Sequence, residues 1–576
     1  MKMNKKDVIG CLETIATYLE IKGDNPFKIS AYRKAALALE SDERTLVEID
    51  NPVSLNGIGK GTAEVILELK NEGKSSLLKE LQEEVPSGLL PLLKLPGLGG
   101  KKIGKLYKEL QVVNMDTLQQ VCEEKKVQTL AGFGKKTEEK ILIAIQEANT
   151  RPERLALPIV LPIAEAIERA LTDMPSVERF SRAGSLRRMK ETVKDLDFII
   201  ATTDPETVKS GLLELEAMSK VIANGDTKVS VEITTDFPIS VDFRMVLPEE
   251  FATTLHHFTG SKDHNVKMRQ LAKKRGESIS EYGVENLETS EVKTFKTEQE
   301  FFAHFQLPYI PPEAREDQGE VELAAKRKEF PIYLTNEDIR SDLHMHTTWS
   351  DGAHSIEEMV ETAKARGYEY IAITDHSKFL RVANGLSVER LKEQHAKIRR
   401  LNEHYDDFTI LTGIEMDILP DGTLDYEDDI LSEVDFVIAA IHSSFQQDRS
   451  TIMYRLKTAL ENKHVDLIAH PTGRLLGRRD GYDVDVEMLI QLAKETNTAL
   501  ELNANPHRLD LSAYWLKKAE EAEVVLAINT DAHNKESLDL MSYGTAVARK
   551  AMLKSNSVMN TWPLERLQKY LRRYEN

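Results

Sequence analysis

The sequence predicts a multidomain protein in which helical domains come first, an α+β part follows, and an α/β barrel comes last. Three observations predict this order. A glycine-containing turn followed by a helical pattern occurs three times before residue 150. Short apolar strands that carry aspartates follow between residues 195 and 246. Beyond residue 340, short apolar strands alternate with helical stretches. With 576 residues, the chain is long enough for several such domains.

Composition narrows the classes of function. Apolar residues make up 41% of the chain, which is enough for packed cores, and no apolar run is long enough to cross a bilayer. Residues 1–20 show the pattern of an amphipathic helix rather than a signal peptide. Two cysteines, Cys11 and Cys122, are too few for a disulfide framework, so we expect a cytoplasmic protein. Because the net charge is −19, any contact with DNA must be local.

The N-terminal part repeats the pattern apolar-x-Gly-apolar-Gly, followed by lysine and a helical stretch, starting at Leu55, Leu95 and Leu130. The glycines permit a tight turn, and the free N–H groups that begin the next helix suit a phosphate. The pattern resembles the helix-hairpin-helix motif, which binds the DNA backbone without reading its sequence. The DNA-binding residues expected from this pattern are Gly57, Gly59, Lys60, Gly97, Gly99, Lys101, Lys102, Gly132 and Gly134.

Two aspartates open an apolar run that predicts a buried strand over residues 195–201. Side chains two residues apart on a strand point to the same face, so Asp195 and Asp197 repel each other unless a cation lies between them. Mg²⁺ is the hard ion that suits such oxygen ligands. Just upstream, Gly184-Ser185 forms a turn with N–H donors near two arginines, which suits a phosphate.

A third carboxylate, Asp242, lies in a second strand-like run. The strands expected over 229–235 and 239–246 can pair as a hairpin across a proline-containing turn. We also expect a helix near 205–219.

This arrangement resembles the palm of nucleotidyltransferases, and the segment from Phe258 to Arg269 resembles the thumb of family X DNA polymerases, the DNA polymerase beta relatives. The resemblance implies a DNA-directed DNA polymerase that fills short gaps in DNA repair, including base excision repair. Asp195, Asp197 and Asp242 would then be catalytic and would bind two Mg²⁺ or Mn²⁺ ions. The nucleotide-binding residues would be Gly184, Ser185, Arg188, Gly260, Ser261, Asn265 and Arg269.

The same resemblance implies a monovalent cation held by backbone carbonyls of the first two helix-hairpin-helix turns. Val65 stands where the animal enzyme has the lysine of its lyase site, which leaves Lys60 and Lys70 as candidates for that role. His257 stands in place of a tyrosine and Lys262 in place of an aspartate. The domains implied are an N-terminal helical domain (1–80), fingers (81–150), a palm (151–247), a thumb (248–318), a linker (319–335) and a barrel (336–576).

The C-terminal part has its own chemistry, since eleven of the fifteen histidines follow residue 340. Seven strands are expected, and several end in a histidine or a carboxylate; in α/β barrels such strand ends converge on one rim. His and carboxylate ligands without cysteine, in this number, indicate two or three Zn²⁺ or Mn²⁺ ions. Such a site makes a hydroxide near neutral pH and hydrolyses phosphoesters. The strands are expected at 340–344, 370–374, 409–414, 435–441, 465–469, 499–503 and 524–529.

The run from His344 to Gly352, with Thr374-Asp375-His376, resembles the polymerase and histidinol phosphatase (PHP) domain. The resemblance implies a (β/α)7 barrel with 3′–5′ exonuclease activity; abasic-site cleavage and 3′-phosphate removal are further activities it leaves open. The implied metal ligands are His344, His346, Asp351, His376, Glu415, His442, His470, Asp531 and His533.

The expected partners are gapped or primed DNA and deoxynucleoside triphosphates, with no membrane, and we expect a monomer associated with the nucleoid. Three alternatives remain open from the sequence. The first is a small-molecule phosphatase of the histidinol-phosphate type, and the second is a nucleotidyltransferase that acts on RNA or a small acceptor. The third is a non-catalytic DNA-binding scaffold.

Overall fold

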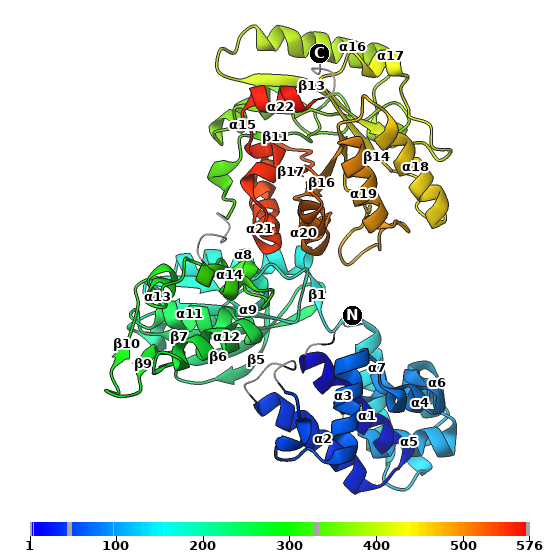
Figure 1. Ribbon diagram of the computed structural model, residues 1–576, viewed down its shortest axis with the longest axis vertical. Helices are drawn as coiled ribbons and strands as arrows, with labels where there is room; N and C mark the ends of the chain where they lie inside the picture. Colours follow the sequence, from blue (N-terminus) through cyan, green and yellow to red (C-terminus); the bar gives the residue numbers. More distant parts are fainter. Residues whose placement is uncertain are drawn as a thin grey trace. The chain divides into compact units, whose positions relative to one another are not determined.

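A computed structural model describes residues 3, 5–42, 46, 49–95, 97–150, 152–326 and 333–571 of the chain. The chain divides into two compact units, Met1–Glu153 and Arg154–Asn576, which we describe one at a time (Figure 1). Among the described residues, no helix combines the length and the apolar character needed to cross a membrane.

The first unit is helical, and one hydrophobic core runs through it from Val8 to Ile145. The two N-terminal domains expected from the sequence therefore share a core. Its helices are α1 (Lys5–Lys22), α2 (Pro26–Ser41), η1 (Pro52–Ser54), α3 (Lys60–Glu72), α4 (Ser76–Glu84), η2 (Ser87–Lys94), α5 (Gly100–Leu110), α6 (Met115–Glu123), η3 (Val127–Thr129) and α7 (Lys135–Thr150).

The second unit begins with a five-stranded sheet in the order β2-β4-β7-β6-β5. In it, β4 is parallel to β7, and β6 is antiparallel to β7, so the expected hairpin is present. The elements are β1 (Leu155–Ala156), α8 (Leu157–Thr172), β2 (Arg179–Arg182), α9 (Gly184–Arg187), β3 (Thr192–Val193), β4 (Asp195–Ala201), α10 (Pro205–Leu212), β5 (Met218–Asn224), β6 (Lys228–Thr234) and β7 (Pro238–Val246).

The helix expected near 205–219 is shorter in the structure, because α10 ends at Leu212 and the edge strand β5 begins at Met218. None of the residues of β5 is buried, and Val221 and Ile222 are exposed. A strand that buries neither face lacks the alternation that reveals strands in a sequence, which explains why β5 was missed.

The following elements surround a second core of phenylalanines, among them Phe301 and Phe302. Residues 319–335 were expected to be a linker, but residues 320–326 form helix α14, and Glu320 and Ala324 are fully buried. The charges that suggested a solvated linker are paired: Glu320 accepts from His264 Nδ1 at 2.8 Å. Residues 327–332 of the expected linker lie outside the described residues. The elements are α11 (Phe251–Thr259), α12 (Lys262–Lys273), β8 (Glu277–Ile279), β9 (Val284–Asn286), β10 (Val292–Lys293), α13 (Glu298–His304), η4 (Pro312–Ala314) and α14 (Glu320–Lys326).

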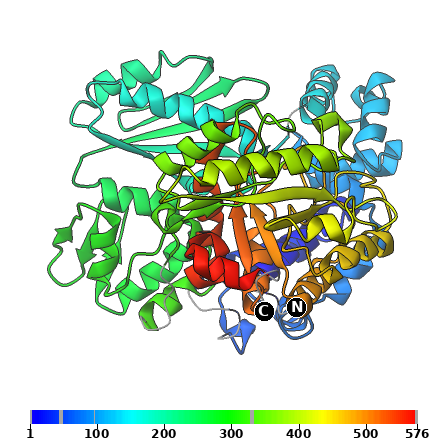
Figure 2. The same cartoon turned by 90° about the horizontal axis from the view of Figure 1, so that it is seen from above.

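Seven parallel strands follow in sequential order, β11 to β17. The first and last are joined by a bridge between Met345 and Ala532, and Asn560 donates to the Ser341 carbonyl and accepts from Ile528 N–H across the same seam. Figure 2 shows these strands, coloured yellow-green to orange, inside a layer of helices. The expected barrel of seven βα units is confirmed.

The strands of the barrel are β11 (Ser341–Asp342), β12 (Tyr370–Ile373), β13 (Thr409–Asp417), β14 (Phe436–Ala440), β15 (Leu467–Ile468), β16 (Ala499–Asn503) and β17 (Leu526–Asn529). Its helices are η5 (Asn336–Asp338), α15 (Ile356–Ala365), η6 (Arg381–Ala383), α16 (Val388–Asn402), α17 (Asp428–Leu431), α18 (Arg449–Glu461), α19 (Val486–Thr496), α20 (Ala513–Glu521), η7 (Lys535–Leu540), α21 (Met541–Ala551), η8 (Ser555–Ser557), η9 (Met559–Thr561) and α22 (Leu564–Tyr570).

A buried ion triad ties α9 to the start of α13. Glu298 lies 2.6 Å from Arg187 Nη2 and 2.6 Å from Arg315 Nη1, and the Arg315 side chain is fully buried. Burial would raise the pKa of Glu298, but Arg315 and Arg187 outweigh it and hold that pKa well below its ordinary value.

We predict that Glu298→Ala destabilises the second unit by about 3–5 kcal/mol, because it leaves two buried guanidinium groups without their counter-ion. Since the pKa of Glu298 is lower in the folded than in the unfolded chain, the stabilisation is full above the unfolded value of about 4.3 and is lost as the pH falls towards the folded value. Thermal unfolding at pH 7 and at acidic pH measures this. Exposed Glu288→Ala is the control and should change stability by less than about 0.5 kcal/mol; an equal effect of both variants would contradict the prediction.

Candidate active sites in the palm and the barrel

The three aspartates predicted to be catalytic meet at one end of the palm sheet. The parallel pairing of β4 with β7 places Asp197 directly opposite Asp242, and Asp195 opposite Ser240. Burial, together with the charges of Asp195 and Asp242, raises the pKa of Asp197 to about 7. A cluster of three carboxylates, one of which is costly to charge, offers the oxygen ligands that divalent cations such as Mg²⁺ prefer.

The neighbouring strand supplies partners for one of these carboxylates. Asp242 Oδ1 accepts a hydrogen bond of 2.6 Å from Ser230 Oγ, and Asp242 Oδ2 lies 2.7 Å from Lys228 Nζ. Both partners are on β6, the strand that pairs with β7. The sequence analysis predicted this pairing but no role for either residue. The serine and the lysine therefore hold the Asp242 carboxylate in place from β6.

Gly184 packs against the carboxylates at the start of the short helix α9. Its φ is +58°, and a Cβ atom added there would lie 2.1 Å from Asp197 Oδ2. Only glycine allows the backbone and this carboxylate to approach so closely. Ser185 is the next residue of α9 and is half-buried.

The other expected nucleotide-binding residues lie around the junction of α11 and α12. Arg188 donates from Nη1 to the Thr259 carbonyl, and a Cβ atom on Gly260 would lie 3.3 Å from the same Nη1. Arg188 and Gly260 are therefore adjacent.

Ser261, Asn265 and Arg269 are engaged in building helix α12. Ser261 Oγ caps the helix by accepting from the N–H of His264 at 3.1 Å. Asn265 Nδ2 donates to the His257 carbonyl at 2.7 Å, and Arg269 Nε donates to the Asn265 carbonyl at 3.3 Å. The ring of His257 is half-buried against Phe258, and burial lowers its pKa.

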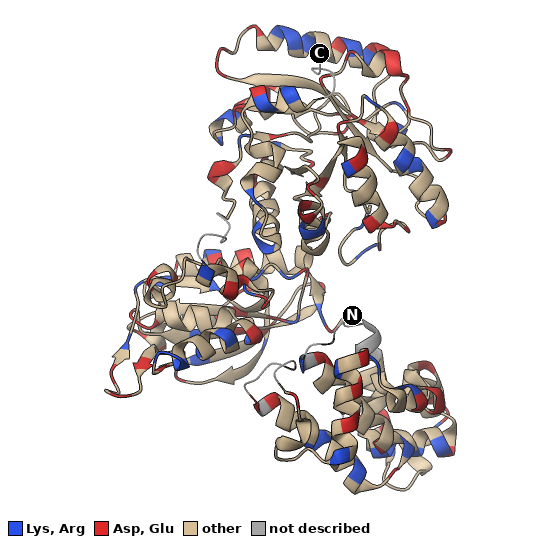
Figure 3. Ribbon diagram, in the orientation of Figure 1, with Lys and Arg blue, Asp and Glu red and all other residues tan. Residues whose placement is uncertain are grey.

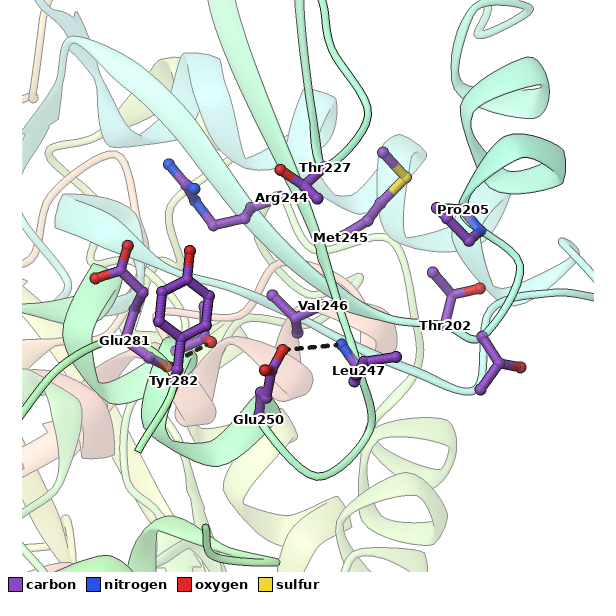
Figure 4. A pocket seen from close by; sticks show the side chains of 12 residues that line it. Thr202, Pro205, Thr227, Arg244, Met245, Val246, Leu247, Glu250, Glu281 and Tyr282 are labelled. Atoms are coloured by element: carbon purple, nitrogen blue, oxygen red, sulfur yellow. Dashed lines mark hydrogen bonds between the residues drawn. The ribbon is translucent and has the colours of Figure 1, made fainter. Parts of the chain in front are cut away.

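A pocket of about 280 Å³ lies at the end of β7 (Figure 4). The last residues of β7 and the residue that follows the strand line it: Arg244, Met245, Val246 and Leu247. Glu281 and Tyr282 line the opposite side, and the Glu281 carbonyl accepts from Thr254 Oγ1 at 2.8 Å. No pattern in the sequence predicts this pocket, because its lining comes from segments far apart in the chain.

In the first unit, the three glycine turns have the expected geometry. Gly57, Gly97 and Gly132 have φ values of 104°, 80° and 89°, which favour glycine. Gly59 and Gly99 are the N-caps of α3 and α5, and Gly134 directly precedes α7. Each turn therefore presents the start of a helix.

The lysines at these turns fall into two groups. Lys60 and Lys101 are exposed. Lys102 Nζ instead donates to the Gly97 carbonyl at 2.9 Å and lies over the Phe133 ring, so it joins the second turn to the third. Figure 3 shows acidic and basic residues interspersed along the helices of the first unit, so an interaction with phosphates depends on the helix starts as much as on net charge.

In the barrel, the nine predicted ligands converge at the carboxyl ends of the strands. Three groups can each hold an ion: His346, Asp351, His376 and His533; His344, His346 and Asp531; and His376, Glu415 and His442. The ninth residue, His470, lies with its Nε2 2.9 Å from Glu415 Oε1. The shared residues His346 and His376 join the three groups into one cluster.

Unpaired ligand atoms show that these residues fit metal ions. Among the described residues, His344 Nε2 and His346 Nδ1 are buried without a hydrogen-bond partner. His344 Nε2 lies 3.4 Å from Glu415 Oε1 and 3.5 Å from Asp531 Oδ1, so one ring nitrogen and two carboxylates face one point. Imidazole and carboxylate donors in this number match Zn²⁺ or Mn²⁺ better than Mg²⁺.

Two further carboxylates orient the histidines and were missed by sequence reasoning. Glu501 Oε1 lies 2.7 Å from His344 Nδ1, and Asp417 Oδ1 lies 3.2 Å from His442 Nδ1. Burial lowers the pKa of His344, but Glu501, Glu415 and Asp531 outweigh it and raise that pKa above its ordinary value. A carboxylate on the far nitrogen of a histidine fixes its tautomer and strengthens it as a ligand.

Comparison with known proteins agrees with this geometry. The DNA polymerase beta thumb model matches residues 254–316, the PHP domain model matches residues 342–505, and a helix-hairpin-helix domain model matches residues 3–75. The DNA polymerase/3′-5′ exonuclease PolX of Bacillus subtilis (strain 168) is 60% identical over 571 residues, which cover 99% of this chain and 100% of the relative. The chain belongs to the PolX family, the bacterial family X DNA polymerases with a PHP domain.

The barrel alone is also similar to proteins described as probable phosphatases. One from Thermoanaerobacter sp. (strain X514) is 28% identical over 242 residues, which cover 40% of this chain and 94% of the relative. Another, from Acetivibrio thermocellus, is 31% identical over 166 residues, which cover 28% of this chain and 64% of the relative. In the PolX family this phosphatase-like barrel follows a polymerase, so the small-molecule phosphatase alternative is not favoured.

We predict that Gly184→Ala lowers nucleotide addition by about 100-fold, because the new methyl group displaces Asp197 by an ångström or more. Single-nucleotide extension of gapped DNA measures the effect. Gly211→Ala is the matched control, since its Cβ would meet only the flexible end of Met174, at 3.2 Å. Extension by Gly184→Ala at the rate of the control would contradict the close approach to Asp197.

We predict that Glu501→Gln weakens the affinity of the barrel for Zn²⁺ or Mn²⁺ by about 10- to 100-fold, because His344 loses the carboxylate that orients it. Metal content after dialysis against graded chelator measures the affinity without any turnover. Glu487→Gln, at an exposed position of α19, should keep the original metal content. Equal retention of metal by the two variants would show that Glu501 does not support His344.

Proposed function

We propose that this chain is a DNA-directed DNA polymerase that fills short gaps during DNA repair, including base excision repair, and that its barrel removes nucleotides as a 3′–5′ exonuclease. The observation that carries the proposal is the register of β4 and β7, which sets Asp197 opposite Asp242. The same chain also gathers nine metal-ligand candidates in its barrel, eight in three groups and His470 beside Glu415. The full-length similarity to a DNA polymerase/3′-5′ exonuclease supports both activities.

In the palm, Asp195, Asp197 and Asp242 would hold two Mg²⁺ or Mn²⁺ ions. Such ions, when bound, activate the 3′-hydroxyl of a primer and neutralise the triphosphate. Arg188 and the N–H groups at the start of α9 would bind the triphosphate, while Gly184 keeps that backbone against Asp197. Ser230 and Lys228 hold Asp242 in place while the primer end approaches.

In the first unit, the helix starts after Gly59, Gly99 and Gly134 would bind phosphates of the DNA backbone, with exposed Lys60 and Lys101 beside them. A monovalent cation would be held by main-chain carbonyls at the first two turns. Lys102, whose Nζ contacts both the second and the third turn, would affect DNA binding only by stabilising these turns. Lys70 donates to the Ile49 carbonyl at 2.9 Å and Val65 is buried, so exposed Lys60 is the better candidate for a lyase amine.

In the barrel, His344, His346, Asp351, His376, Glu415, His442, His470, Asp531 and His533 would hold two or three Zn²⁺ or Mn²⁺ ions. Such ions, when bound, supply a hydroxide that attacks a phosphodiester. Glu501 and Asp417 orient His344 and His442 for this task. Abasic-site cleavage and 3′-phosphate removal are further phosphoester reactions that the same cluster could perform.

We also infer that the substrates are gapped or primed DNA and deoxynucleoside triphosphates, met in the cytoplasm at the nucleoid. A monomer suffices, because one chain supplies the residues of the palm cluster and of the barrel cluster. Both cysteines are free thiols, which agrees with a reducing compartment.

The test compares gapped-DNA extension and 3′-end degradation for the wild type, Asp195→Ala and His344→Ala, with Mg²⁺ and with Mn²⁺. We expect Asp195→Ala to lose extension and keep degradation, and His344→Ala to do the reverse, because the two clusters use different ligands. Loss of both activities in either variant would contradict separate sites. Extension of RNA or of a small acceptor in preference to gapped DNA would favour the alternative nucleotidyltransferase.

A further inference from the structure

The Glu316 carboxylate lies where three cationic side chains meet. Arg188 Nε is 3.1 Å from Oε1, Lys190 Nζ is 2.8 Å from Oε2, and Lys550 Nζ is 3.4 Å from Oε1. Glu316 is 11% exposed and Lys550 is 15% exposed, so solvent screens these charges only partly. The first two cations follow the palm helix α9, whereas Lys550 is on helix α21 of the barrel.

This cluster controls the position of Arg188, which the proposed function assigns to the triphosphate. Its Nε faces Glu316, and its Nη1 donates to the Thr259 carbonyl. Among the described residues, Nη2 makes no hydrogen bond with the protein, so it can donate to a phosphate. The main-chain carbonyl of Arg188 accepts from Lys550 Nζ at 2.7 Å. The barrel lysine therefore holds both the backbone and the counter-ion of this arginine.

We propose that Lys550 of the barrel is a positioning residue of the polymerase site, which orients Arg188 towards the triphosphate of the incoming nucleotide. This inference rests on the proposed function. With Lys550, the corner has three positive side chains and one carboxylate, a net charge that attracts a triphosphate. Without it, Glu316 is shared by fewer cations and draws Arg188 more strongly to itself.

Other contacts between α21 and its surroundings separate this role from simple docking. The adjacent Arg549 pairs with Glu313 at 2.7 Å and donates to the Leu334 carbonyl at 3.1 Å. Tyr543, on the same helix, donates to Glu165 Oε1 at 3.0 Å. None of these three contacts involves Arg188 or Glu316. A loss of docking alone should therefore have the same effect through Arg549 as through Lys550.

The experiment measures single-nucleotide insertion into gapped DNA by the full chain over a range of nucleotide concentrations. For Lys550→Met we expect KM for the nucleotide to rise about tenfold with kcat within about twofold, because ground-state binding of the triphosphate is weakened. The Kd of tripolyphosphate, measured by calorimetry without DNA, should rise in parallel. Exonuclease activity should stay unchanged, since Lys550 contacts none of the nine ligand candidates.

Arg549→Met is the matched control, and it should leave KM and the tripolyphosphate Kd unchanged. If Lys550→Met lowers the Tm, Lys550→Arg serves instead: it keeps the charge, and its KM should stay within about threefold of the wild type. An unchanged KM and Kd in Lys550→Met, or an equal rise in Arg549→Met, would overturn the proposal. A wild-type chain that added no nucleotide would refute the proposed function, while the tripolyphosphate Kd values would still test Lys550.

Discussion

Mutual repulsion between carboxylates is the constraint on which the palm depends. A parallel pair of strands sets Asp197 directly opposite Asp242 at a fixed register, so the backbone keeps the two aspartates on neighbouring positions of one sheet face. The fold must answer this charge with cations. Lys228 neutralises part of the negative charge by pairing with Asp242. The negative charge that remains on the aspartates suits the divalent cations of a metal-dependent nucleotidyl transfer. The absence of a Cβ atom at Gly184 then lets the start of α9 approach the Asp197 carboxylate closely.

The barrel also brings several carboxylates together, but it combines them with histidines. Its candidate metal ligands follow the ends of several strands, so their convergence results from the parallel order of the strands. Histidines require an orienting partner that carboxylate ligands do not, because only one ring nitrogen can face the metal. The strands supply this partner from within the barrel, through Glu501 on β16 and Asp417 on β13. A site built on rigid strands with oriented ligands is suited to hydrolysis, where the attacking group must be held in line.

Much of this organisation could be predicted from the sequence, at places where the apolar periodicity of a strand coincides with residues that can bind metal ions. The β4 strand was predicted with its observed bounds because two aspartates open a run of buried residues, and the seven barrel strands were found because each is a short apolar run. β5 was missed because it buries neither of its faces. Helix α14 was missed because Glu320 is balanced by His264, a partner 56 residues away that no local pattern reveals. A role for Glu501 could have been predicted, because it lies inside the apolar strand Ala-Leu-Glu-Leu-Asn and a buried carboxylate needs a partner.

The ion cluster at Glu316 could not be predicted from the sequence. Lys550 is 234 residues from Glu316, on a helix whose sequence gives no hint of a role in the palm. Burial lowers its pKa to about 8, although Glu316 opposes the shift, so the fold keeps this charge at a cost. If this lysine only held the barrel against the palm, an apolar residue could replace it and avoid the cost of burying a charge. Such replacements are often neutral or stabilising. We therefore infer that the charge of Lys550 is used at Arg188, because Lys550 contacts both the main-chain carbonyl of Arg188 and its counter-ion Glu316.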